Sequence, residues 1–316
     1  NLGISQFVSI GNKADISSND LIEFWEQDPG TDLILLYLES FGNPRRFARI
    51  AKRVSRHKPI VAVKAGRTGA GRRAAGSHTA ALAADEVAVE ALFHQTGVIR
   101  AETLGEMFDL ALTLSSQPLP RGRRVAILTN AGGLGILCAD ACEANGLVVQ
   151  RPSAQTKRRL REFLSPEASV ENPVDMIASA SAEDFRKAIE ILLCADEADA
   201  LIILTIDVGL ADIAAVSREI HRGVIASRSK SGAGKSVLTC IMEGGKGAQA
   251  ASSAVEQLPN LDYPESAARA ITRIAEAGAV GGSIEDYDPS GHIYDLQHAV
   301  ERIAAAVEAA RAGEAG

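Results

Sequence analysis

Short apolar segments alternate with helical patterns along this chain, and the alternation constrains the fold more than any other feature. The apolar runs lie at 33–38, 59–64, 123–129, 200–206 and 236–242. Runs of this kind, each followed by a helix, are typical of parallel strands covered by helices on both faces. The sequence therefore predicts an α/β fold of flavodoxin-like, three-layer domains with mostly parallel sheets.

The chain also contains a degenerate repeat. Asn12-Lys13-Ala14-Asp15 in the first half is echoed by Asn172-Pro173-Val174-Asp175 in the second half. A helix, an acidic turn and an apolar strand follow each of these motifs in the same order. A domain duplication explains this order better than a chance echo of generic α/β texture. The length of 316 residues likewise favours two domains over one.

A Pro-containing linker at 117–122 is the best domain boundary. We expect a first flavodoxin-like domain at 1–118 and a second at 119–280. Residues 281–316 are expected to form a linker followed by a C-terminal helix over about 294–311.

The second half opens with the strand 123–129 and a helix that have no counterpart in the first half. Their equivalents would lie before Asn1. In a sheet of strand order 2-1-3-4-5 the missing strand is central. We therefore expect the parent protein or another chain to supply it.

Charge and composition exclude several classes of function. A net charge of −7 argues against a nucleic-acid binder, which needs clustered Lys and Arg. No apolar run has the length of a membrane span, and no signal-peptide pattern opens the chain. The four cysteines form no C-x-x-C pair and lie in apolar stretches, as reduced thiols do. We expect a cytoplasmic protein without nucleic-acid or membrane partners.

The glycine-rich, basic segment 66–82 is the strongest candidate for chemistry. It follows the strand 59–64 and is expected to form a loop before a helix near Ala80. Open α/β sheets bind ligands at such strand ends, and three arginines make this loop attractive to anions. The imidazole of His78 is a competent nucleophile near pH 7. A polar residue beside a helix start is the alternative, and the residues alone leave the two readings evenly balanced.

The turn Thr129-Asn130-Ala131-Gly132-Gly133 is a second candidate, because it joins a predicted strand to a predicted helix. Backbone N–H groups at a helix start bind anions, and each such end contributes about 0.3–2 kcal/mol. A dinucleotide-binding turn is the rival interpretation. Cys138 replaces the third small residue that this motif requires, and Gln150 replaces the acidic residue that would hold a ribose. We therefore favour a phosphate-binding turn.

Glu39 follows the strand 33–38 and so belongs to the same row of strand ends as the His78 loop. A carboxylate there could orient an imidazole and stabilise its charged form. The ordinary alternative is a solvated glutamate. The remaining histidines show no metal-like spacing, so we expect no metal ligands.

Taken in order, these motifs resemble the nucleoside-diphosphate-forming acyl-CoA synthetases, the superfamily of succinyl-CoA synthetase and ADP-forming acetyl-CoA synthetase. The segment Gly76-Ser77-His78-Thr79-Ala80-Ala81-Leu82 is similar to the family's phosphohistidine loop. The segments 8–15, 65–68, 129–133 and 171–175 also match in order, and the resemblance spans about residues 3–278. It implies succinyl-CoA synthetase-like domains that are flanked elsewhere by a CoA-binding domain and an ATP-grasp domain.

The resemblance implies that His78 carries a phosphoryl group and that Glu39 holds its imidazole. One phosphate-cradling helix would begin at 130–133, and its partner helix would lie before Asn1. The phosphate-binding residues implied in this way are Gly66, Arg67, Thr68, Ser77, Thr79, Asn130, Ala131, Gly132 and Gly133. Family loops often carry Gly after His-Thr, where this chain has Ala80.

The implied activity is that of an ADP-forming acid–thiol ligase, in which acyl-CoA, phosphate and ADP reversibly give acid, CoA and ATP. This chain itself would hold no cofactor, whereas the complete enzyme would use CoA, ATP or ADP, and Mg. CoA-binding and ATP-grasp domains, a small acyl substrate and a second copy of the chain are the expected partners. The alternative is an acyl-CoA- or nucleotide-sensing module that regulates a fused protein N-acyltransferase.

Overall fold

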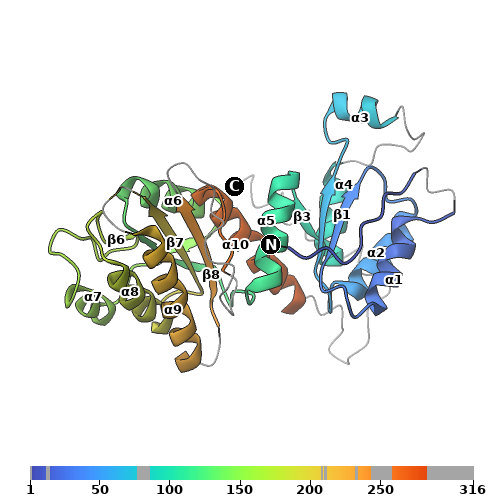
Figure 1. Cartoon of the computed structure of the whole chain (residues 1–316). Helices are drawn as coiled ribbons and strands as arrows, with labels where there is room; N and C mark the ends of the chain where they lie inside the picture. The colour runs from blue at the N-terminus through green and yellow to red at the C-terminus, as the bar shows by residue number, and fades with distance from the viewer. Residues whose placement is uncertain are drawn as a thin grey trace, which may run out of the picture. The chain divides into compact units, whose positions relative to one another are not determined.

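Asn1–Gly278 and Ala279–Gly316 are separate compact units, and the first contains both sheets (Figure 1). The residues that the computed structural model describes are 2–11, 15–76, 86–207, 209, 212–231, 234–242 and 258–282. The helix predicted over 294–311 lies outside them, as do Ser77, His78 and Thr79 of the predicted site. The predicted domain boundaries remain predictions.

The first part of the chain folds around a parallel sheet of order β1-β2-β3. Its elements are α1 (Ser18–Gln27), β1 (Ile34–Leu38), α2 (Pro44–Val54), β2 (Ile60–Lys64), α3 (Gly69–Gly76), α4 (Glu86–Thr96), β3 (Ile99–Ala101) and α5 (Leu104–Ser116). Apolar residues of α1, α2 and α4 are buried against one face of this sheet. Met107 and Leu110 of α5 pack with Val61 and Val63 of β2 on the other face. The result is a three-layer α/β/α arrangement.

The second part builds a larger sheet. Its elements are β4 (Arg124–Thr129), α6 (Gly132–Ala144), β5 (Val148–Val149), α7 (Ala154–Arg161), β6 (Val174–Asp175), α8 (Ala182–Cys194), β7 (Ala200–Ile206), α9 (Ile213–Ser231), β8 (Ser236–Met242) and α10 (Pro264–Gly282). The strand order is β5-β4-β7-β8, the short β6 pairs with β4, and Asn260 forms a bridge beside β8. This order has the predicted flavodoxin-like pattern, with β4 near the centre.

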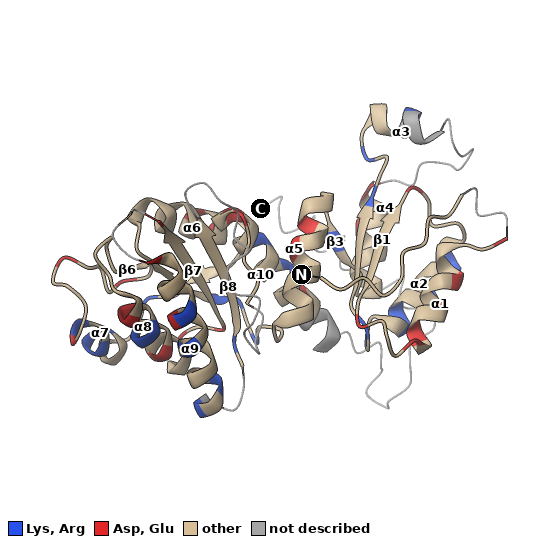
Figure 2. Ribbon diagram, viewed as in Figure 1, with Lys and Arg blue, Asp and Glu red and all other residues tan. Residues whose placement is uncertain are grey.

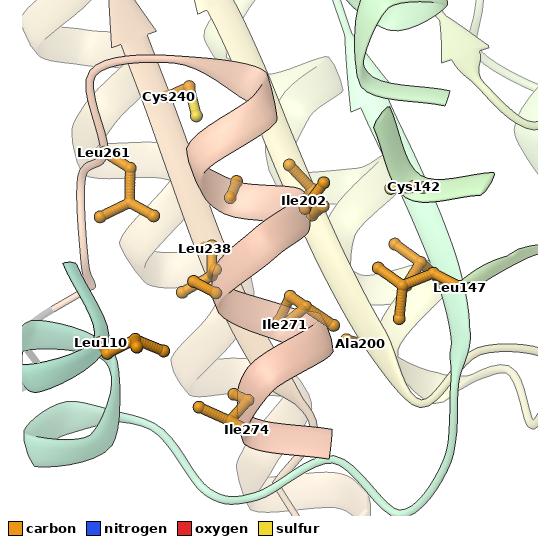
Figure 3. Packing of buried hydrophobic residues seen from close by; sticks show 14 of the residues in the cluster. Leu110, Cys142, Leu147, Ala200, Ile202, Leu238, Cys240, Leu261, Ile271 and Ile274 are labelled. Atoms are coloured by element: carbon orange, nitrogen blue, oxygen red, sulfur yellow. The ribbon is translucent and has the colours of Figure 1, made fainter. Parts of the chain in front are cut away.

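Helices cover both faces of the second sheet as well. Buried side chains of α7, α8 and α9 pack on one face, and those of α6 and α10 pack on the other. Figure 3 shows Ile271 and Ile274 of α10 beside Leu238 of β8 and Leu110 of α5. The predicted fold class is therefore confirmed.

Local sequence signals explain where several helices begin. Ser181 and Asp184 form a capping box at the start of α8, which satisfies backbone N–H groups that a helix start leaves unpaired. Ser17 and Asp20 do the same for α1. The main difference lies after β2, where a loop was expected and residues Gly69–Gly76 form α3 instead. The Thr68 hydroxyl accepts the N–H of Gly71 at 3.0 Å and so caps this helix.

Candidate functional site

Two predicted site segments leave neighbouring strands at one edge of the first sheet. Leu38 of β1 is paired with Lys64 of β2, and the N–H of Ala65 donates to the Leu38 carbonyl at 2.9 Å. Glu39 is exposed and follows β1 directly. Gly66 follows Ala65 and has φ +80°, a conformation that favours glycine. The structure thus brings Glu39 close to the start of the predicted loop, as the sequence predicted.

The turn after β2 is too tight for side chains at some positions. A Cβ atom on Gly71 would lie 3.3 Å from the Cα atom of Gly66 and from the Thr68 hydroxyl. This close approach explains why glycine occupies position 71. It also gives Gly66 and Thr68 a structural role in forming the turn, beside the predicted role in binding phosphate.

Arg67, a predicted phosphate ligand, is engaged by carboxylates of this chain. Its Nη1 contacts Glu102, and its Nε lies 3.9 Å from Oε1 of Glu86. About 40% of its side chain is exposed. An anion that reached Arg67 would therefore compete with two glutamates for the guanidinium.

His78, Ser77 and Thr79 lie outside the described residues, and the structure does not test their predicted roles. The described residues that flank them are Gly76, which ends α3, and Glu86, which begins α4.

The predicted phosphate-binding turn of the second sheet lies where β4 enters α6. The Asn130 side chain is engaged with β7, because Nδ2 donates to the Ile206 carbonyl and Oδ1 accepts the Ile206 N–H, both at 3.1 Å. Asn130 is only 8% exposed. It therefore fixes the shape of the turn. The Ala131 N–H donates to the Thr129 hydroxyl at 3.0 Å, so any anion binding there falls to the backbone N–H groups of Gly132 and Gly133.

The first turn of α6 packs closely against the Asn172-Pro173-Val174-Asp175 motif. A Cβ atom on Gly132 would lie 2.7 Å from Oδ2 of Asp175, and one on Gly135 would lie 3.1 Å from Cβ of Pro173. A Cβ atom on Gly133 would meet no atom within 4 Å. Gly133 therefore marks the open side of this helix start.

Asp175 was not among the predicted site residues, although its motif was recognised as part of the repeat. The side chain of Asn172 positions this motif by bonding the N–H of Ile127 at 2.9 Å and the carbonyls of Val125 and Gln150 at 2.7 and 2.9 Å. As a result, the Asp175 carboxylate lies at the positive end of the α6 dipole, where a negative charge is stabilised.

Sequence analysis also missed Arg100, which lies on β3 between apolar residues. Its side chain is 6% exposed and bonds Oε2 of Glu90 at 2.6 Å, together with Glu86. Burial works against the charge, but these two carboxylates outweigh it and raise the pKa of Arg100. The signal in the sequence was a single arginine within an apolar strand.

Metal-binding clusters and membrane-spanning helices can be assessed for the described part of the chain. No group of three or more His, Cys, Asp or Glu side chains there is arranged to hold a metal ion. Among the helices that can be described, none combines the length and apolarity needed to cross a membrane.

Two family models match the chain. A succinyl-CoA ligase-like flavodoxin domain matches residues 1–114, and a ligase-CoA domain matches residues 125–272. Similar curated proteins include the alpha subunits of two ADP-forming acetate–CoA ligases of Pyrococcus furiosus, II and I, at 40% and 37% identity. These alignments cover 90% and 86% of this chain but only 62% and 58% of the two relatives.

A solved structure with the same fold is acetyl-coenzyme A synthetase 1 of Ca. Korarchaeum cryptofilum in complex with phosphate and ADP. It is 32% identical with a TM-score of 0.77, and the match covers 87% of this chain and 59% of that one. The chain described here therefore spans about three fifths of the length of these relatives.

Proposed function

Because the chain belongs to the nucleoside-diphosphate-forming acyl-CoA synthetases, we propose that it is the phosphoryl-carrying core of an ADP-forming acyl-CoA ligase. In the complete protein, acyl-CoA, phosphate and ADP are converted reversibly to acid, CoA and ATP. His78 is the residue that links the two halves of this reaction.

The chemistry at His78 consists of two transfers of one phosphoryl group. An imidazole nitrogen attacks the phosphorus of an acyl phosphate, the bond from phosphorus to the carboxylate oxygen breaks, and the free acid leaves. A terminal oxygen of ADP then attacks the same phosphorus, the P–N bond breaks, and ATP forms with His78 restored. Glu39 stabilises the charged imidazole between these steps.

One observation carries this proposal beyond the motif itself: Glu39 and the segment leading to His78 leave adjoining strands at the same edge of the sheet. That edge is where open α/β sheets bind ligands. The backbone of Glu39 therefore lies beside the backbone from which the segment leading to His78 begins.

The start of α6 supplies a phosphate station in this proposal. Its free N–H groups and its dipole favour an anion on the open side marked by Gly133. Asp175, on the other side of the helix start, repels the anion and so limits where it can settle. Binding by backbone N–H groups needs no metal at this station, whereas Mg²⁺ would accompany the nucleotide at the ATP-grasp domain.

The remaining partners belong to the complete protein. A CoA-binding domain and an ATP-grasp domain, on the same chain or on another subunit, complete the ligase. We further propose a small acyl substrate, a homodimer and a cytoplasmic location.

The test is phosphate incorporation into the complete protein from γ-labelled ATP. Wild type is expected to take up label that is stable in base and labile in acid, as a phosphohistidine is. The variant His78→Ala loses the label. The control His94→Ala changes an exposed histidine of α4 and keeps it. Labelling that survives in His78→Ala refutes the carrier role, and wild type that binds acyl-CoA without labelling favours the sensing module.

A further inference from the structure

Arg100 carries a full charge in an almost fully buried position. Its two Nη atoms bond two carboxylates, and its Nε lies near a third carboxylate without forming a hydrogen bond. Nη1 bonds Glu90 at 2.6 Å, Nη2 bonds Glu86, and Nε lies 3.2 Å from Oε1 of Glu102. A buried guanidinium without such partners would be strongly unfavourable, so the three glutamates are what allow an arginine at this position.

Two of the three glutamates also contact Arg67. Glu102 contacts Nη1 of Arg67, and Glu86 lies 3.9 Å from Nε of Arg67. Arg67 follows β2 by three residues, and Glu86 is the first residue of α4. The segment 67–86 contains His78. Its last residue, Glu86, contacts Arg100 directly, and its first residue, Arg67, contacts Glu102, which lies 3.2 Å from Nε of Arg100.

The ties matter because of the length of chain between them. Residues 68–85 separate the two tied ends along the chain. The ion pairs hold Arg67 within 3.9 Å of Glu86, the other end of the segment, and hold Glu86 against Arg100. Fixing both ends reduces the volume that a side chain on the segment can visit, and so raises its effective concentration at a site nearby.

The same cluster continues beyond the first sheet. Arg273 of α10 lies 3.9 Å from Glu102 and 3.5 Å from Glu106 of α5, whose side chain is 8% exposed. Glu102 directly follows β3, and Figure 2 shows acidic residues on α5 and basic residues on α10. Glu102 is therefore shared by three arginines, which fixes its carboxylate in one place.

We propose that Arg100 is a positioning residue for phosphoryl transfer. It holds Glu86 and Glu102 and, through Glu102, Arg67, and in this way sets both ends of the segment that carries His78. The inference rests on the proposed function of His78 and adds to it a residue that never touches the phosphate.

The complete protein with Arg100→Lys or Glu86→Gln tests this role. Lysine keeps the charge of Arg100 but not the planar fork that reaches several carboxylates. Glu86→Gln removes one tie from a side chain that is 42% exposed, so this variant is expected to fold even if the first one does not. The matched control is Glu183→Gln, another ion-paired glutamate in the first turn of a helix, α8.

The readouts are the single-turnover rate of label transfer from ATP to His78, the KM for ATP, and the melting temperature. We expect Arg100→Lys and Glu86→Gln to slow labelling roughly tenfold while the KM for ATP changes less than about twofold. Glu86→Asp, which keeps the charge, is expected to recover most of the rate, and Glu183→Gln is expected to leave it unchanged.

A rate that stays at the wild-type value overturns the positioning role. So does a loss of labelling that matches the loss of folded protein, since that outcome marks a structural role only. In both cases a wild type that labels on His78 leaves the proposed function standing. A wild type that takes up no label at all refutes the proposed function and the positioning role together.

Discussion

Asn130→Asp is expected to increase local opening at the end of β7, because this isosteric change replaces the donor of one of two hydrogen bonds with an acceptor. The Asn130 amide donates to the Ile206 carbonyl and accepts the Ile206 N–H, both at 3.1 Å. An aspartate still accepts the N–H, but its second oxygen faces the Ile206 carbonyl. The loss of one hydrogen bond costs about 0.5–1.5 kcal/mol, and leaving a poorly solvated group unpaired adds about 1–3 kcal/mol.

The expected total of about 1.5–4.5 kcal/mol corresponds to a roughly 13- to 2,000-fold rise in local opening. Hydrogen exchange followed by mass spectrometry on the peptide 200–206 in the complete protein measures it. The control is Asn260→Asp. Asn260 accepts bonds from the Ile241 N–H at 2.8 Å and from the Thr239 hydroxyl at 3.1 Å through its Oδ1, which an aspartate preserves. Equal exchange rates in the two variants would refute this reasoning.

Three further predictions address single side chains. Glu39→Gln removes the carboxylate beside the histidine segment and is expected to lower the labelling rate by about 10²-fold, checked in the γ-labelled ATP assay. Hydrogen bonds from the Ser17 side chain and backbone lower the pKa of Asp20 to about 2. The contribution of Asp20 to stability is therefore present above its ordinary pKa of 3.8 and lost as pH falls toward 2. Melting temperatures measured across this pH range should show this loss in the wild type but not in Asp20→Asn. In denaturant unfolding, Gly133→Ala is expected to be neutral or to stabilise α6 by up to about 1 kcal/mol. Gly132→Ala must displace the Asp175 carboxylate and is expected to lower the stability of the protein. The same change in stability for both variants would contradict the close contact between Gly132 and Asp175.

Much of the fold was predictable from the sequence because local and tertiary preferences agree in most elements. The ranges predicted for β7 (200–206) and β8 (236–242) match the structure residue for residue. Each of these strands is a continuous apolar run of a buried parallel sheet, and α8 has its own capping box. Such segments need no information from distant residues.

The differences arise where a contact between distant residues decides the outcome. The glycines of 69–76 predicted a loop, but the Thr68 cap and the close approach of Gly71 to Gly66 produce α3. Asn130 was predicted from its motif as part of a phosphate site, and only the position of Ile206 reveals that its side chain joins two strands.

The cluster around Arg100 could not be predicted for the same reason. Its members come from β3, the start of α4, the turn after β2, the nearby helix α5, and helix α10, which is distant in sequence. Each glutamate alone has the pattern of an ordinary surface residue, as do Arg67 and Arg273, and only Arg100 differs, as a single arginine within an apolar strand. The fold gathers these charges around one buried guanidinium, because β3 places Arg100 beside Glu86 at the start of α4.

The most direct test of the carrier role is a chase of the isolated phosphoprotein. The complete protein is labelled with γ-labelled ATP, freed of nucleotide, and mixed either with ADP or with a small carboxylic acid and CoA. If His78 carries the phosphate, ADP recovers the label as ATP, and the acid with CoA releases it as inorganic phosphate while acyl-CoA forms. Label that maps to His78 but leaves with neither acceptor would contradict the account.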